Sequence, residues 1–366
     1  MKKLFTVAFT LFLTFNFYPA QADTPVVRIV DTPHTNFDGT FIDNKLAQEL
    51  TSDGKLGKLI YSKRAEVTWV IDAALLDEII DMSNGYTFNK KEDLVGQNAA
   101  QAFLNRLSFI TVGDPIVALP YGNPDAAAVR AISPGELALY SKVAQAKLES
   151  YFGKPVISQN GWGTGRSRLD VFSRARYREN RAIIASLSRN VKDPEISQFR
   201  VRLGRLFNPL LNTEERSYFS TSAITESEKI TSKLRVVSGR YQLTSQSVKV
   251  PITLINNFDT ATTLNLSLIP MNSRVQVENI NNVLVPPHSR IQLSVPFRVI
   301  APGNVVVKAQ FMTPKGEMVG VQSKLNLSLT VIDSRVAWFT TAAGVALFLG
   351  AVAQSVRRFK RGRNEK

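Results

Sequence analysis

"VTWVIDAALLDEI", residues Val67–Ile79, decides the fold of the first half of the chain. Its first part is almost entirely apolar, as expected of a strand buried on both faces of a sheet. From Ala73 onward, the apolar residues recur at helical spacing. Asp72 lies at the junction, so its carboxylate either caps the helix or carries chemistry at the end of the buried strand.

The same order of strand and helix recurs further along the chain. "DPIVALP" (114–120) is followed by "DAAAVRAI" (125–132), and "AQAKLESYFG" (144–153) leads into "KPVISQ" (154–159). Such alternation predicts a parallel sheet covered by helices on both faces. We therefore expect an α/β domain over residues 23–221, either an incomplete β/α barrel-like unit or an open parallel sheet.

Between residues 222 and 333 the apolar period changes to two, for example in "YQLTSQSVKVPITLINN" and "SKLNLSLTVI". Several short alternating strands separated by turn residues are typical of an immunoglobulin-like β-sandwich. The polar segment "STSAITESEKITSK" (220–233) is the expected hinge between the two domains.

The two ends of the chain carry targeting signals. Residues 1–22 combine two lysines, an apolar run and Ala-Gln-Ala, which predicts a cleaved signal peptide. Residues 336–356 hold no charge and predict a transmembrane helix, and the basic residues 357–366 predict a cytoplasmic tail. We expect a single-pass protein of the cell membrane whose bulk is extracellular and whose C-terminus is cytoplasmic.

The formal net charge is +15, and the chain has no cysteine. An exported protein meets no nucleic acid, so anionic envelope polymers, cell-wall glycans and the membrane surface are the expected partners. The absence of cysteine excludes thiol chemistry and cysteine metal sites.

Histidine is scarce, because His34 and His288 are the only two in the chain. No histidine pair with zinc-hydrolase spacing can be built, so we assign neither a metal ligand nor a cofactor. His34 follows Asp31 closely and either helps to hold a ligand or is an ordinary loop residue.

Three acids follow predicted strands, where parallel α/β folds bind their ligands. They are Asp31, Asp72 and Asp125. Asp72 and Asp125 form a candidate acid–base pair for cleavage of a glycosidic bond, with Asp31 or His34 assisting. The alternative is that Asp72 and Asp125 only cap the helices that follow them.

Aromatic and basic residues are further ligand-binding candidates. Tyr121 and Trp162 lie in turn-rich loops and either stack on a ligand or complete the packing of the sheet. Arg174, Arg178 and Arg181 recur at helical spacing and either bind phosphate-bearing polymers or form a solvated helix face.

Four segments together resemble a known family: "VDTPHTNFDGTFIDNKLAQEL" (30–50), "EVTWVIDAALLDEI" (66–79), "PIVALPYGNPDAAAV" (115–129) and "VKVPITLINNFD" (248–259). They resemble an uncharacterised actinobacterial family of secreted, membrane-anchored proteins. This family is known only as a domain of unknown function. The resemblance implies a cell-envelope role, because such proteins are often encoded near the flippase for peptidoglycan lipid precursors.

Two classes of function fit these features. The first is a non-enzymatic binding or scaffolding module for cell-wall components or for the export machinery of wall precursors. The second is a glycan-processing hydrolase that uses the rim carboxylates of the α/β domain. We favour the non-enzymatic module and keep the hydrolase as the alternative.

Overall fold

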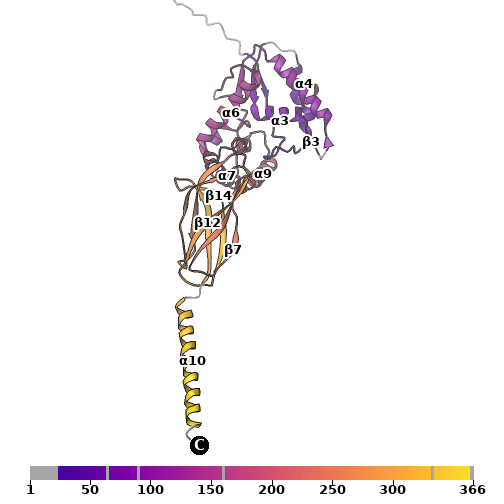
Figure 1. Ribbon diagram of the computed structural model, residues 1–366. Helices are drawn as coiled ribbons and strands as arrows, with labels where there is room; N and C mark the ends of the chain where they lie inside the picture. Colours follow the sequence, from indigo (N-terminus) through magenta and orange to yellow (C-terminus); the bar gives the residue numbers. More distant parts are fainter. Residues whose placement is uncertain (1–23, 63–65, 89–90, 159–160, 331–333, 363–366) are drawn as a thin grey trace, which may run out of the picture.

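The computed structural model describes residues 24–62, 66–88, 91–158, 161–330 and 334–362. The expected signal peptide, residues 1–22, lies outside the described residues. Along the chain, Figure 1 shows an α/β region, a cluster of helices, a β region and the C-terminal helix α10. The protein thus combines the α/β and all-β parts that the sequence predicts.

A parallel sheet of three strands forms the centre of the α/β region. Strands β1 (Val26–Ile29), β2 (Thr68–Asp72) and β5 (Ile116–Leu119) lie side by side in chain order. A parallel bridge between Val117 and Ile157 adds one more neighbour at the β5 edge. This sequential order is that of a partial β/α barrel, and the sheet stays open, as expected from the few repeats.

Both faces of this sheet are buried. Trp69 and Ile71 belong to the main hydrophobic core, whereas Val70, Val117 and Leu119 pack together on the opposite face. Burial on both faces explains why the strands read as continuous apolar runs.

Helices and one short hairpin surround the sheet. They are α1 (Lys45–Glu49), α2 (Lys55–Tyr61), α3 (Ala73–Ser83), β3 (Thr87–Phe88), β4 (Lys91–Glu92), α4 (Leu94–Ile110), α5 (Ala126–Ile132) and α6 (Pro134–Phe152). The helical cluster that follows comprises α7 (Val171–Asn190), α8 (Pro194–Arg202), the 3-10 helix η1 (Leu203–Phe207) and α9 (Thr213–Ser232).

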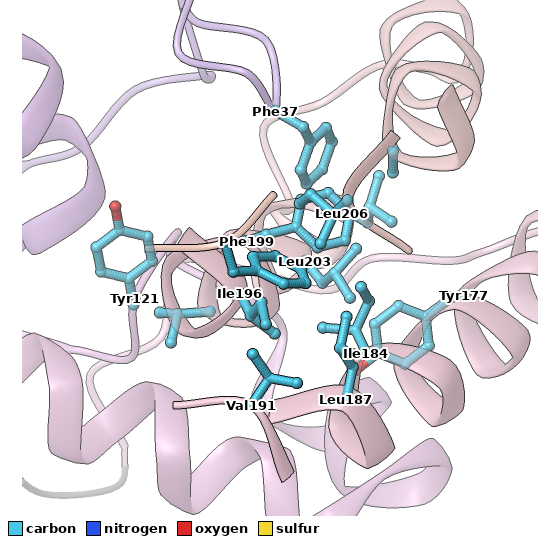
Figure 2. Packing of buried hydrophobic residues seen from close by; sticks show 14 of the residues in the cluster. Phe37, Tyr121, Tyr177, Ile184, Leu187, Val191, Ile196, Phe199, Leu203 and Leu206 are labelled. Atoms are coloured by element: carbon cyan, nitrogen blue, oxygen red, sulfur yellow. The ribbon is translucent and has the colours of Figure 1, made fainter. Parts of the chain in front are cut away.

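The helical cluster has a dense apolar core of its own side chains and of Phe37 (Figure 2). Ile184 and Leu187 from α7, together with Leu203 from η1, are fully buried there. The rings of Phe37 and Phe199 meet edge to face at 5.6 Å between centroids. This packing attaches the loop after β1 to helix α8.

The prediction of a hinge over residues 220–233 is wrong, because most of this segment belongs to helix α9. Phe219, Ala223 and Ile230 are buried along one face of this helix. A capping box between Asn212 and Glu215 fixes its first turn. The segment looks like a linker because its exposed face is polar, but its few apolar residues recur at helical spacing.

The β region is one connected sheet of nine strands. Its strands are β6 (Leu234–Val236), β7 (Gly239–Leu243), β8 (Ser247–Asn256), β9 (Thr262–Pro270), β10 (Val275–Val277), β11 (Ile280–Val285), β12 (Ser289–Val299), β13 (Gly303–Met312) and β14 (Met318–Leu329). Burial alternates along β8 and β14, so a single face supplies the core, as the period of two predicts.

The immunoglobulin-like topology expected for this region is not confirmed. Strand β6 pairs with β8 on one side and with β14 on the other. This double pairing joins the two groups of strands into one sheet. Strands β6 and β7 run parallel to β14, whereas the other pairs are antiparallel. Strand β6 follows α9 directly, so no hairpin joins it to a preceding strand.

Helix α10 (Ser334–Gly362) covers the segment that was expected to span the membrane, together with the first basic residues after it. Over the part of the chain that the structure describes, no helix has both the length and the apolar character needed for a transmembrane span. The expected span over residues 336–356 is therefore not supported.

Candidate functional site at the rim of the parallel sheet

The carboxyl ends of β1 and β2 and the loop after β5 meet at one edge of the sheet, called the rim here. The loop after β1 brings Asp31 and His34 to this edge, β2 ends in Asp72, and the loop after β5 brings Tyr121. All four residues are buried. The rim therefore places polar side chains in a water-poor environment, where their charges interact strongly.

Asp72 caps helix α3 and also fixes the loop after β5. Its Oδ1 accepts hydrogen bonds from the backbone N–H of Ala74 and of Gly122, each at 2.9 Å. Burial raises the pKa of Asp72 to about 7, although the two N–H donors and the Arg205 guanidinium favour its charged form. The capping role is visible in these contacts, and a catalytic role stays a prediction.

Glu78 and Arg205 form a buried ion pair near Asp72. The distance between Glu78 Oε1 and Arg205 Nη1 is 3.1 Å. Glu78 also accepts hydrogen bonds from the backbone N–H groups of His34 and Thr35 and from the Thr35 hydroxyl. The pair joins α3, the loop after β1 and η1. Such a network is stabilising only while both charges are present.

Two glycines allow η1 to approach the loop after β5. Gly122 has a φ of +83°, and a Cβ there would meet Arg205 Cγ at 2.8 Å. A Cβ on Gly204 would meet the carbonyl oxygen of Tyr121 at 2.9 Å. A larger residue at Gly122 would clash with Arg205, and one at Gly204 would clash with the backbone of the loop after β5.

Asp125 has hydrogen-bond partners of its own, which differ from those of Asp72. Its Oδ1 caps α5 by accepting from the N–H of Ala127 and Ala128, and its Oδ2 accepts from the N–H of Ser167. The small cavity lined by Asp72 does not include Asp125. Both carboxylates cap helices, and their role as an acid–base pair stays a prediction.

Asp31 and His34 lie beside a third residue, Glu49 at the end of α1. Burial would raise the pKa of Asp31, but Glu49 and Lys55 lower it by more. Burial would lower the pKa of His34, but the hydrogen bond with Asp43 and the charge of Glu78 raise it by more. Burial and the Asp31 carboxylate raise the pKa of Glu49 to about 7.

A cleft of about 270 Å³ opens beside the Glu78–Arg205 pair. Its lining combines acids, bases, amides and one aromatic ring: Thr35, Asp77, Asp81, Tyr121, Val143, Lys147, Ser197, Gln198, Val201, Arg202 and Arg205. Tyr121 donates its hydroxyl proton to Asp77 at 2.7 Å, and Lys147 pairs with Asp77 at 2.9 Å. Figure 2 shows the Tyr121 hydroxyl pointing away from the apolar core of the helical cluster.

The other predicted ligand-binding residues lie elsewhere. Trp162 packs against Val70, Val117 and Leu119, so it covers the second face of the parallel sheet. On α7, Arg174 and Arg178 are exposed, whereas Arg181 is half-buried with its Nη1 at 3.8 Å from Glu136. None of these four residues lines the cleft at the rim.

Four further polar residues of this region were not predicted from the sequence: Glu49, Asp77, Glu78 and Arg205. One signal for Glu78 was present, because it lies on the apolar face of the helix after Asp72, where an acid needs a buried partner. Arg205 gives no such signal, since it comes from a distant segment of the chain.

Comparison with known proteins adds little on function. A search of the curated proteins gave no match. Native α-2-macroglobulin of E. coli is 15% identical over 26% of this chain and 6% of its own, with a TM-score of 0.21. The C. elegans MSP family member WR4 is 12% identical over 27% of this chain and 98% of its own, with a TM-score of 0.20. A PapD-like domain of human CEP192 is 12% identical over 28% of this chain and 88% of its own, with a TM-score of 0.21.

A family model does match the chain over most of its second half and its helical cluster. The model is that of DUF6049, a family of unknown function, and it covers residues 156–364, more than half of the chain. The sequence resemblance to an uncharacterised family is confirmed at this level, and the chain belongs to the DUF6049 family.

Proposed function

We propose that the protein is a binding module of the cell envelope whose rim cleft takes a polar, hydroxyl-rich ligand, such as a segment of cell-wall glycan. The cleft is the observation that carries this proposal. It lies at the carboxyl end of a parallel sheet, where α/β folds bind their ligands, and its volume is near the lower end for ligand sites.

The chemistry of the lining supports a sugar-like ligand. Asp77 and Asp81 supply acceptors, Lys147 and Arg202 supply donors, and Gln198 supplies both. Hydroxyl groups both donate and accept hydrogen bonds, so they match such a mixed lining better than a simple anion or an apolar ligand does. Asp77 is already held by Tyr121 and Lys147, which limits the reorganisation needed on binding.

A larger hollow of about 500 Å³ lies over β7, β13 and β14. Its lining contains a single charged residue, Arg240, and comes from strand surfaces. We favour the rim cleft because its polar groups come from several segments and converge.

The direct test uses two lysines on α6. Replacing Lys147 by Gln is expected to weaken the binding of soluble peptidoglycan fragments by about tenfold, because the variant loses a charged donor at the cleft. Lys142→Gln is the matched control, since Lys142 is exposed on the same helix and does not line the cleft. Isothermal titration calorimetry on the full-length protein measures both. Equal affinity in the two variants, or no binding by the wild type, would overturn the proposal.

A glycan-processing hydrolase is the second candidate function. The observation in its favour is the raised pKa of Asp72, about 7, which suits a general acid near neutral pH. Under this view Asp72→Asn abolishes the release of reducing ends from purified cell wall. Unchanged release in that variant would eliminate Asp72 as the acid.

We propose that the bulk of the chain lies on the outer side of the cell membrane and that the flippase for wall precursors is a candidate partner, because the sequence resemblance implies both. Protease added to intact cells should then digest the folded part. Copurification from gently solubilised envelopes should recover wall or flippase components, and their reproducible absence would contradict the scaffolding role.

A further inference from the structure

Three buried polar atoms at the rim face one another without a hydrogen-bond partner among the described residues. They are Asp31 Oδ2, His34 Nε2 and Glu49 Oε2. One potential ligand atom from each of the three residues lies within 4.8 Å of those of the other two. An unsatisfied buried polar atom costs free energy, and three converging ones in a single place are unusual in a folded protein. The cluster therefore calls for a ligand that satisfies all three atoms at once.

Neighbouring groups hold two of these atoms, His34 Nε2 and Asp31 Oδ2, in a ligating orientation. His34 Nδ1 lies 3.2 Å from Asp43 Oδ1, and a proton on Nδ1 leaves the lone pair of Nε2 free. Asp31 Oδ1 accepts from the backbone N–H of Thr32 at 2.8 Å and from Lys55 Nζ at 2.9 Å, which leaves Oδ2 free. A carboxylate behind a ligating histidine is the usual support of a protein metal site.

We propose that Asp31, His34 and Glu49 bind a divalent cation, with Zn²⁺ as the ion that best matches one imidazole nitrogen and two carboxylate oxygens. Zn²⁺ binds such atoms at about 2.0–2.2 Å, so its ligands lie about 3–4 Å from one another. The three atoms must close slightly around the ion. Glu49 is the least buried of the three and can supply that movement.

Water completes the coordination in this site, because the described part of the chain offers three ligands there. Lys55 stays on the other oxygen of Asp31 and is largely exposed, so its charge is screened by solvent. The inference goes beyond the proposed ligand cleft and does not depend on it, because none of the three ligands lines that cleft.

Histidine-labelled NMR tests the site with little ambiguity, since the chain holds only two histidines. Adding one equivalent of Zn²⁺ to the full-length protein is expected to shift the Nε2 signal of His34 and leave His288 unchanged. Calorimetry on the same sample should give one site, and the midpoint of thermal unfolding should rise by several degrees. Mn²⁺ and Ca²⁺, added separately, distinguish a zinc site from a site for harder cations.

Two variants and one control complete the test. Glu49→Gln and His34→Gln should each weaken Zn²⁺ binding by at least tenfold, whereas His288→Gln should bind as the wild type does. Glu49→Gln keeps the test valid if His34→Gln fails to fold, because Glu49 is the least buried of the three residues. Wild-type affinity in Glu49→Gln, no shift of His34, or binding only at His288 would overturn the proposal.

Discussion

Replacing Arg205 by Met is expected to lower the free energy of unfolding of the α/β region by about 3–5 kcal/mol. The variant leaves the Glu78 carboxylate buried without its counter-ion, although the N–H groups of His34 and Thr35 still donate to it. It also removes the hydrogen bond from Arg205 to the Thr35 hydroxyl. Urea unfolding followed by tryptophan fluorescence measures the loss.

The matched control is Arg189→Met. Arg189 also pairs with a glutamate, Glu317, at 2.9 Å, but both side chains are about half exposed. A solvent-exposed pair contributes about 0–1 kcal/mol, so this variant should unfold almost as the wild type does. The double variant Glu78→Gln/Arg205→Met should recover part of the stability, because no charge is left uncompensated. A loss below about 1 kcal/mol in Arg205→Met would contradict the proposed role of the buried pair.

Asp72 is expected to make the stability of the protein fall as the pH rises from about 4 to about 7. Its pKa is about 7 in the folded protein and near 3.8 in the unfolded chain, so the folded state binds more protons in this window. By linkage, the wild type should lose about 4 kcal/mol relative to Asp72→Asn across it. Thermal unfolding of both proteins at several pH values measures the difference.

Asp170 supplies a control of opposite sign. It caps α7, and the hydrogen bonds from Ser173 lower its pKa. The stabilisation from its charged form is present above the unfolded pKa and is lost as the pH falls, so Asp170→Asn should differ most from the wild type at neutral pH. If the difference between the wild type and Asp72→Asn does not change with pH, Arg205 keeps Asp72 charged and the proposed burial effect is wrong.

Local sequence signals predicted the elements of the rim well. The sequence around Asp72 predicted both the end of the buried strand and the start of the helix. These features depend on a few neighbouring residues, namely a continuous apolar run and a capping acid. Asp125 before α5 was predicted in the same way. The alternating strands after residue 234 were also predicted, since burial on one face repeats with a period of two.

Contacts between distant segments were not predictable. The Glu78–Arg205 pair depends on how η1 packs on the rim, and no local pattern reports that. The parallel pairing of β6 with β14 joins segments far apart in the sequence, and strand propensity does not report which strands pair. Asp31 and His34 were singled out, but Glu49 joins them only because α1 folds back beside the loop after β1.

Hydrogen–deuterium exchange of the full-length protein, with and without soluble peptidoglycan fragments, shows whether a wall glycan binds at the rim cleft. It maps a ligand without assuming which residues bind it. Binding at the rim cleft predicts slower exchange in segments 77–81, 121–123 and 197–205, with no change across the β region. Slower exchange confined to residues 234–329, or no change anywhere at saturating ligand, would contradict the account.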